Sequence, residues 1–260
     1  MKRVIKNKKG AIIFEGNNLR GADLRDADCW HADFQRLDCW NVNFQEANCI
    51  EANFYKSNCG YANFEETNCW NVNFQEADLH DAAFEKAYCE GVNFQKAICS
   101  NADFYKAHCV DANFYKADCW RANFQEADFQ EADFYKAHCV DANFYKADCW
   151  RANFEEANCR NVNFQEANCE GANFEKADLR GVNFHKTDLL HANLKDIIID
   201  TPILQINGSR DQFIKWKDQI QIGCIIEQKD WWLKNYKKTM KEYNYTPEQI
   251  KEYYEYIIGY

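Results

Sequence analysis

Hydrophobic and polar positions follow one another with a period of five residues along most of this chain. From Phe14 to Leu194 a Phe, Leu or Cys occupies every fifth position, usually preceded by a small residue and then Asn or Asp, and followed by two mostly polar residues. This period fits neither the 3.6-residue turn of an α-helix nor the two-residue alternation of a β-strand. Short segments joined by tight corners do fit it, because Asn and Asp hydrogen-bond the backbone at corners. The pattern therefore predicts a solenoid of 37 short units.

The units, such as Ala-Asp-Phe-Tyr-Lys at residues 102–106, resemble those of the pentapeptide-repeat family. The resemblance covers residues 11 to about 196 and implies an all-β solenoid, a right-handed quadrilateral parallel β-helix with four units in each coil. Four units per coil give about nine coils, and a spacing of about 4.8 Å between stacked strands gives a tube about 45 Å long. We expect a capping strand in residues 1–10, the β-helix in 11–199, and a small α+β capping module in 200–260.

The central residues of the units form four columns, which we name after an early member of each. The Phe44 face contains Phe44, Phe64, Phe84 and Phe104, and the Phe54 face contains Phe54, Phe74, Phe94 and Phe114. The Cys29 face contains Cys29, Cys49, Cys69, Cys89, Cys109, Phe129, Cys149 and Cys169, and the Cys39 face contains Cys39, Cys59, Leu79, Cys99, Cys119, Cys139, Cys159 and Leu179. All of these side chains are predicted to point into the tube as its structural interior.

The cysteine columns are interpreted as packing, because a buried cysteine behaves as a small hydrophobic residue. Disulfides along a column are disfavoured, since neighbours about 4.8 Å apart with parallel Cβ directions do not match disulfide geometry. A second hypothesis is that the columns bind a soft metal such as Cu(I) or Zn. No Cys-x-x-Cys pair supports it, and we predict no cofactor.

The outer surface offers one candidate interaction stripe, formed by Trp30, Ile50, Trp70 and Trp150 on the Cys29 face. The alternative is that these residues only cover backbone edges. An internal copy bears on this choice, because residues 102–124 return unchanged as residues 132–154. The displacement of 30 residues is one and a half coils, which puts the two copies on opposite faces. Because the duplicated residues lie on opposite faces, the copy favours a scaffold over a single precise site.

Charge narrows the range of partners. The chain has a net charge of -10, and counting by segment gives +5 for residues 1–10, -16 for 11–200 and +1 for 201–260. An acidic tube repels phosphate backbones, so nucleic acid is not expected as a partner, whereas a basic protein surface is compatible. There is no signal peptide and no run of about 18 apolar residues, so we expect no membrane segment. The protein is predicted to be cytoplasmic, with reduced cysteines.

The last 60 residues lose the period and predict short strands followed by two helices. Strands are expected at residues 203–206 and 212–216 around Asn207-Gly208, with a third run at 219–226 that contains Cys224. Asp230 is expected to cap the first helix, with Trp232, Tyr236, Met240 and Tyr243 as its apolar positions, and Thr246, Pro247 and Gln249 to start the second. This part resembles tails of some bacterial and phage pentapeptide-repeat proteins. It is expected to close the tube, leaving the protein a monomer or a dimer through this module.

No catalytic constellation is visible, so we predict a non-enzymatic structural or protein-interaction scaffold. The alternative comes from the family resemblance: some acidic members mimic duplex DNA, bind DNA gyrase and modulate quinolone sensitivity. The acidic tube suits that hypothesis. Five lysines that fall on one face weigh against it, namely Lys56, Lys96, Lys116, Lys136 and Lys176.

Overall fold

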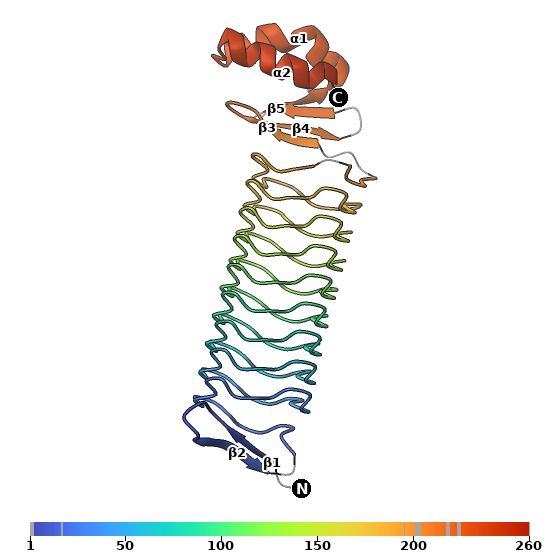
Figure 1. The fold of residues 1–260 in the computed structure, drawn as a ribbon. Coiled ribbons are helices and arrows are strands. Elements are labelled where there is room, and N and C mark those ends of the chain that lie inside the picture. Colours follow the sequence, from blue (N-terminus) through green and yellow to red (C-terminus); the bar gives the residue numbers. More distant parts are fainter. Residues whose placement is uncertain are drawn as a thin grey trace.

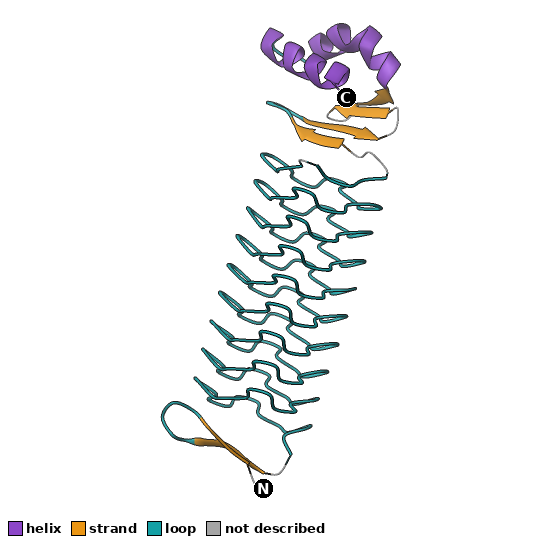
Figure 2. Ribbon diagram, turned by 45° about the vertical axis from the view of Figure 1, so that its right-hand side comes forward, coloured by secondary structure: helices purple, strands orange, loops and turns teal. Residues whose placement is uncertain are grey.

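The computed structural model describes residues 3–16, 18–194, 196–200, 204–216, 219–222 and 225–259. Its central part is a tube of stacked coils (Figure 1). Residues twenty apart are paired in parallel, from Asp23 with Asn43 to Asp178 with Ile198. Each wall contributes one paired residue per coil rather than an extended strand, so the coils are drawn as loops in Figure 2. Twenty-residue coils of four five-residue units confirm the predicted quadrilateral β-helix.

The corners of the coils explain why Asn and Asp recur. At Asn113, the side-chain oxygen accepts the N–H of Tyr115 at 2.8 Å, and the same turn repeats through most of the tube. The next residue, Lys116, has a φ of 55°, in the left-handed region that L-residues seldom occupy. Its N–H donates to the Tyr135 carbonyl of the next coil at 3.0 Å. Hydrogen bonding within and between coils thus stabilises a strained backbone position in nearly every unit.

At the N-terminus the structure differs from the prediction that the β-helix begins at residue 11. Strand β1 (Arg3–Lys6) pairs antiparallel with β2 (Ile12–Gly16), so the first repeats predicted there belong to a hairpin. The run Ile12, Ile13 and Phe14 favours a strand, and Phe14 pairs with Ile5 of β1. The hairpin loop joins the first coil through a hydrogen bond from Lys8 N–H to the Trp30 carbonyl at 3.0 Å.

Beyond the last coil lies a four-stranded antiparallel sheet, with two helices beyond it (Figure 1). The elements are β3 (Leu204–Asn207), β4 (Gln212–Trp216), β5 (Gln219–Ile222), β6 (Ile225–Gln228), α1 (Lys229–Glu242) and α2 (Pro247–Gly259). The single run predicted at 219–226 is therefore two paired strands. Cys224, between them, lies outside the described residues.

The helices test three details of the prediction. The start of α2 is confirmed, because Thr246 and Gln249 exchange hydrogen bonds between side chain and backbone. Asp230 does not cap α1, which begins at Lys229 with Gln228 as its N-cap, and Asp230 lies in the first turn. Tyr243 is not an apolar contact of α1, since it ends the helix and is 48% exposed.

The tube and the C-terminal part have separate hydrophobic cores among the described residues. The tube core is the continuous column of Phe, Cys, Leu, Val and Ala side chains from Ile5 to Leu189. The C-terminal core packs Phe213 and Ile220 of the sheet against Trp232, Tyr253 and Ile257 of the helices. The Trp232 indole also donates to the Ile220 carbonyl at 2.8 Å.

Candidate interaction surface

The interior of the tube is filled by phenylalanine from two facing walls. Phe44 and Phe64 stack with ring centroids 4.9 Å apart and planes within 4°, while Phe44 meets Phe54 of the facing wall edge-on at 5.4 Å and 87°. Stacking along each wall and edge-on contact between walls are both favoured geometries for aromatic rings. The rings meet in the centre, so the two remaining walls have room only for smaller side chains.

Every central cysteine from Cys29 to Cys169 is fully buried and free. Burial raises the pKa of the thiols of Cys69, Cys109 and Cys119 well above the usual value, which favours their protonated form. Within the described part of the chain, no group of three or more His, Cys, Asp or Glu side chains is placed to hold a metal ion. The one central phenylalanine of the Cys29 face, Phe129, meets Phe124 and Phe134 edge-on.

Outside, the two Phe faces carry charges that are paired within the protein. On the Phe54 face the ammonium of Lys136 lies 4.7 Å from the centroid of the Tyr135 ring and 3.3 Å from a Glu156 oxygen. Lys106 on the Phe44 face has the same environment, over Tyr105 at 4.9 Å and 3.4 Å from Glu126. The sequence argument considered lysines on the Phe54 face only; the Phe44 face also carries Lys86, Lys106, Lys146 and Lys186. Both Phe faces therefore carry lysines together with glutamates.

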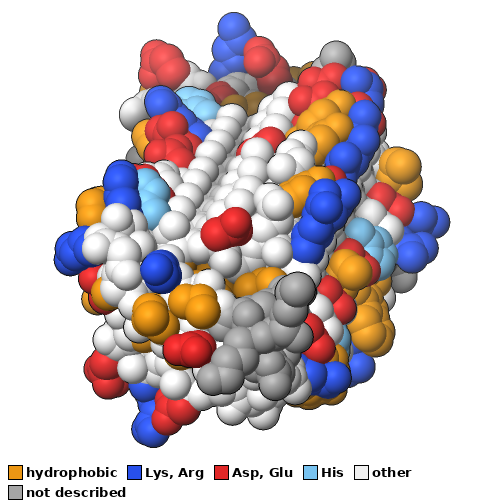
Figure 3. Space-filling view, turned by 60° about the horizontal axis from the view of Figure 1, so that its bottom comes forward, with side chains coloured by type: hydrophobic (Ala, Val, Ile, Leu, Met, Phe, Trp, Pro, Cys, Tyr) orange, Lys and Arg blue, Asp and Glu red, His pale blue; other side chains and the backbone are white. Residues whose placement is uncertain are grey.

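The Cys29 face, in contrast, is strongly acidic. Outside the N-terminal hairpin it carries one cation, Arg151, and nine carboxylates: Asp28, Glu51, Glu90, Asp111, Asp128, Glu131, Asp148, Glu170 and Asp188. The Asp128 carboxyl has a raised pKa, mainly because it is partly buried and also because Asp148 is close. Figure 3 looks onto the N-terminal end of the tube, where hydrophobic and charged side chains lie beside columns formed by the backbone and other side chains.

The predicted stripe of Trp30, Ile50, Trp70 and Trp150 lies on this face, and its members differ in exposure. Trp30, Ile50 and Trp150 are half-buried, whereas Trp70 is 47% exposed. Lys8 covers the Trp30 ring at 4.8 Å and Arg151 covers the Trp150 ring at 4.2 Å. The sequence analysis missed these cations, although the adjacent Trp-Arg pair at 150–151 could have indicated one of them.

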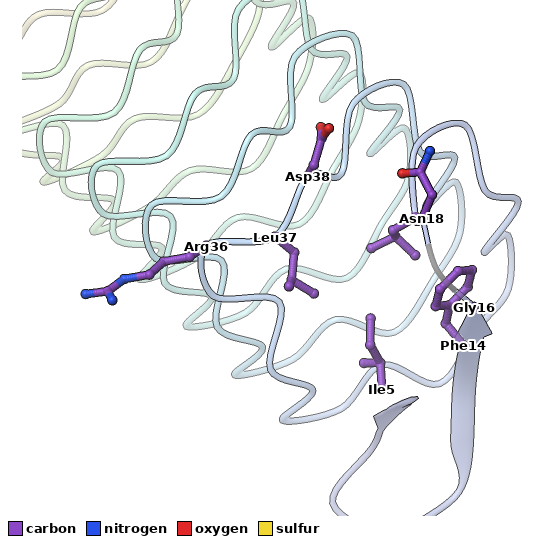
Figure 4. A pocket seen from close by; sticks show the side chains of 8 residues that line it. Ile5, Phe14, Gly16, Asn18, Arg36, Leu37 and Asp38 are labelled. Carbon is purple, nitrogen blue, oxygen red and sulfur yellow. The ribbon is translucent and has the colours of Figure 1, made fainter. Parts of the chain in front are cut away.

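Two of the hollows on the surface of the described residues lie at irregular places in the tube. One, of about 660 Å³, lies where Tyr88 and His108 replace the corner Asn or Asp; their rings stack at 5.3 Å, and Lys86, Lys106 and Glu126 line it. The other, of about 230 Å³, lies between the N-terminal hairpin and the first coil. Figure 4 shows the Ile5 and Leu37 side chains facing this space and the Arg36 side chain pointing away from it. Neither hollow contains the grouping of nucleophile and base that catalysis uses.

The coils and their continuous core define a solenoid repeat scaffold. Models of the pentapeptide repeats (8 copies) match overlapping stretches between residues 13 and 118, and a pentapeptide repeat region model matches residues 117–194. The chain belongs to the pentapeptide-repeat family, whose fold is a right-handed quadrilateral β-helix. No curated protein sequence matches the chain. Among the described residues, no helix has the length and apolar character needed to cross a membrane.

Solved structures of the family are similar to this chain only at low identity. HetL, involved in heterocyst differentiation regulation in the cyanobacterium Nostoc sp. strain PCC 7120, is 26% identical over 70% of this chain and 86% of its own, with a TM-score of 0.41. Full-length QnrB1, a plasmid-mediated fluoroquinolone resistance protein, is 13% identical over 70% and 91%, with a TM-score of 0.32. Rfr23 from the cyanobacterium Cyanothece 51142 is 24% identical over 49% and 88%, with a TM-score of 0.20. These likenesses carry no argument about function.

Proposed function

We propose that the chain is a non-enzymatic scaffold that binds another protein through its Cys29 face. The observation that carries this proposal is the contrast between faces. Lysines such as Lys106 and Lys136 on the Phe faces pair with neighbouring glutamates, whereas the Cys29 face combines nine carboxylates and one arginine with the stripe of Trp30, Ile50, Trp70 and Trp150. Apolar side chains within an electrostatically biased surface are typical of contact sites.

In this proposal the rest of the molecule is a rigid support for the Cys29 face. About nine coils of Phe and Cys packing hold the face straight over about 45 Å. The N-terminal hairpin and the C-terminal sheet with its helices act as caps, which protect the open coil edges from aggregation. The hydrogen bond from the Lys8 N–H to the Trp30 carbonyl supports the role of the N-terminal hairpin as a cap. The protein is a monomer or a dimer through the C-terminal module, where Tyr243 at the end of α1 is exposed. The thirteen free buried thiols support a cytoplasmic location.

Site-specific photo-cross-linking in the native host tests the proposal. A photoreactive amino acid replaces Asn71 or Asp111 on the Cys29 face, and Gln95 on the Phe54 face serves as the matched control. We expect adducts from the two Cys29-face positions, lost when Trp70→Ala is added, and none from Gln95. Equal adducts from both faces, or none from the Cys29 face, would overturn the proposal.

A second candidate function is that of a DNA mimic that binds DNA gyrase and modulates quinolone sensitivity. The acidic column of the Cys29 face favours it, because carboxylates repeated along a rod offer a basic groove a phosphate-like surface. The paired lysines of both Phe faces weaken this likeness. Gyrase supercoiling measured at low and moderate salt distinguishes the candidates. Salt-sensitive inhibition at micromolar protein or below supports mimicry, and unchanged supercoiling contradicts it.

A further inference from the structure

The aromatic rings on the outside of the tube follow a consistent rule. Each of the tyrosines in a Tyr-Lys pair is covered by its own lysine, as Tyr115 is by Lys116 at 5.0 Å. Beyond the hairpin, three tryptophans are covered by arginines: Trp40 by Arg20 at 5.2 Å, Trp120 by Arg121 at 5.3 Å and Trp150 by Arg151 at 4.2 Å. Trp70 breaks the rule, because no cation or second ring lies over it among the described residues.

The surroundings of Trp70 repeat those of Trp150 on the same face, four coils away. In both places the tryptophan is stacked below a glutamate and a glycine of the next coil, Glu90-Gly91 at one and Glu170-Gly171 at the other. At Gly171 a side chain would meet the stem of Arg151 at 3.2 Å, so the glycine gives that arginine its room. At Gly91 a side chain would meet the Asn71 amide oxygen at 2.5 Å, so the shorter Asn71 side chain takes this room and leaves the Trp70 ring uncovered.

The local charge also suits a cation. Glu90 and Asp111 lie on the Cys29 face in the two coils that follow Trp70, and neither forms an ion pair among the described residues. No lysine or arginine of the tube lies on this face before Arg151. A guanidinium is preferred to an ammonium here, because it stacks on aromatic planes and is less strongly hydrated.

We propose that the Trp70 ring binds an arginine side chain presented by a partner protein, with Glu90 beside it. This inference rests on the proposed function and specifies what the partner brings to the Cys29 face. The Trp150 environment, where Arg151 fills the same position from within the chain, is its structural template.

The experiment follows the tryptophan indole N–H resonances of the full chain by NMR, with the Trp70 signal assigned from Trp70→Phe. The probe is an acetylated, amidated Gly-Arg-Gly peptide, and the matched controls contain lysine or uncharged citrulline. We expect a saturable shift of Trp70 alone, about two- to fivefold weaker binding of the lysine peptide, and no shift with citrulline. Equal shifts at Trp120 and Trp150, or an equal response to citrulline, would overturn the proposal.

A variant supplies the cation from within the chain. Asn71→Arg creates the Trp-Arg order of residues 150–151, and its backbone φ of 54° is one that Arg151 already adopts at 53°. It should abolish the peptide-induced shift of Trp70. Asn101→Arg adds the same charge at the same unit position, with a φ of 55°, on the Cys39 face and should leave the shift intact. Equal loss in both variants would contradict a local site.

The two proposals fail differently. If photo-cross-linking from Asp111 persists while Trp70 ignores the arginine peptide, the Cys29 face binds its partner without an arginine at Trp70, and only this inference falls. If cross-linking from the face is absent while Trp70 binds the peptide, the proposed function falls and the arginine site stands.

Discussion

The Phe faces and the Cys faces of the tube share one backbone geometry but differ in the residues that they place inside and outside the tube. Inside, the Phe faces fill the centre with stacked rings, and the Cys faces complete the volume with small thiols. Outside, counting residues 21–194, the Phe54 face balances six cations with six carboxylates, whereas the Cys29 face has nine carboxylates and one arginine. The Phe54 face carries the cations Arg36, Lys56, Lys96, Lys116, Lys136 and Lys176 and the carboxylates Asp33, Glu76, Asp133, Glu155, Glu156 and Glu175.

This difference shows that interior and exterior are set separately in a coil. The interior depends on the size of one residue in five, and the exterior on the two residues that follow it. A wall can therefore become acidic or neutral without any change to the core. The Phe faces support the tube, and the Cys29 face is the wall with the largest excess of negative charge and with an uncovered tryptophan ring.

The largest effect is expected from the centre of a Phe face. Phe104 is fully buried and stacks on Phe84 at 4.7 Å, so Phe104→Ala should reduce the free energy of unfolding by about 3 to 5 kcal/mol. Urea denaturation measures this. Tyr105→Ala, at the adjacent outward position, is the control and should cost far less. An unchanged melting curve for Phe104→Ala would show that the phenylalanine ladder does not hold the tube together.

A smaller effect is expected in a cysteine column. Cys109→Ser places a hydroxyl in a fully buried site, which should cost about 1 to 3 kcal/mol. Cys59→Ser is the matched control, because Ser57 Oγ lies 3.1 Å from the Cys59 sulfur and could hydrogen-bond the new hydroxyl. Denaturation should show the larger loss for Cys109→Ser. Equal losses would mean that the thiols are not simple hydrophobic packing.

The corner turns allow a stabilising test. Ala83 interrupts the Asn/Asp column between Asn63 and Asp103, and the Glu85 N–H has no side-chain acceptor at this corner in the described chain. Ala83→Asn should restore the turn and add about 0.5 to 1 kcal/mol to the free energy of unfolding. Asn113→Ala, which removes the bond to Tyr115, should have the opposite sign. A loss of stability in Ala83→Asn would show that the corner tolerates no side-chain oxygen there.

The smallest expected effect is a difference in the pH dependence of stability between substitutions of Asp128 and Asp178. Partial burial raises the folded pKa of Asp128, so its contribution to stability falls as pH rises through the interval between its unfolded and folded pKa values. Asp128→Asn should therefore stabilise the protein at neutral pH. This advantage should shrink as the pH falls below about 4, where the carboxyl becomes protonated in both states.

Asp178 provides the opposite case. The Arg180 guanidinium, with Nη2 2.5 Å from Asp178 Oδ2, lowers the pKa of this carboxyl, so its stabilising effect is lost as pH falls. Asp178→Asn should destabilise the protein at neutral pH, and the difference should fade in acid. Unfolding measured across pH for both variants checks the signs. The same sign in both would contradict the assigned causes.

The repeat unit and the assignment of residues to faces could be predicted from the sequence because one five-residue rule decides both. The N-terminal boundary could not, since Phe14 keeps the period while it pairs with Ile5 in the hairpin. The stripe on the Cys29 face could be predicted from the sequence, but the cations that cover its tryptophan rings could be predicted only in part. Arg151 follows its tryptophan directly, whereas Arg20 reaches Trp40 from twenty residues away and depends on the coil.

The internal copy at 132–154 is displaced by 30 residues, which is three blocks of ten. Because facing walls have the same kind of interior, inserting any multiple of ten residues keeps phenylalanine over phenylalanine and cysteine over cysteine. An odd multiple turns everything beyond the insertion by half a revolution about the axis. Insertions of this length would rotate one end of the tube relative to the other at no cost to the core. A duplication can therefore change which surface residues of the two ends face the same direction.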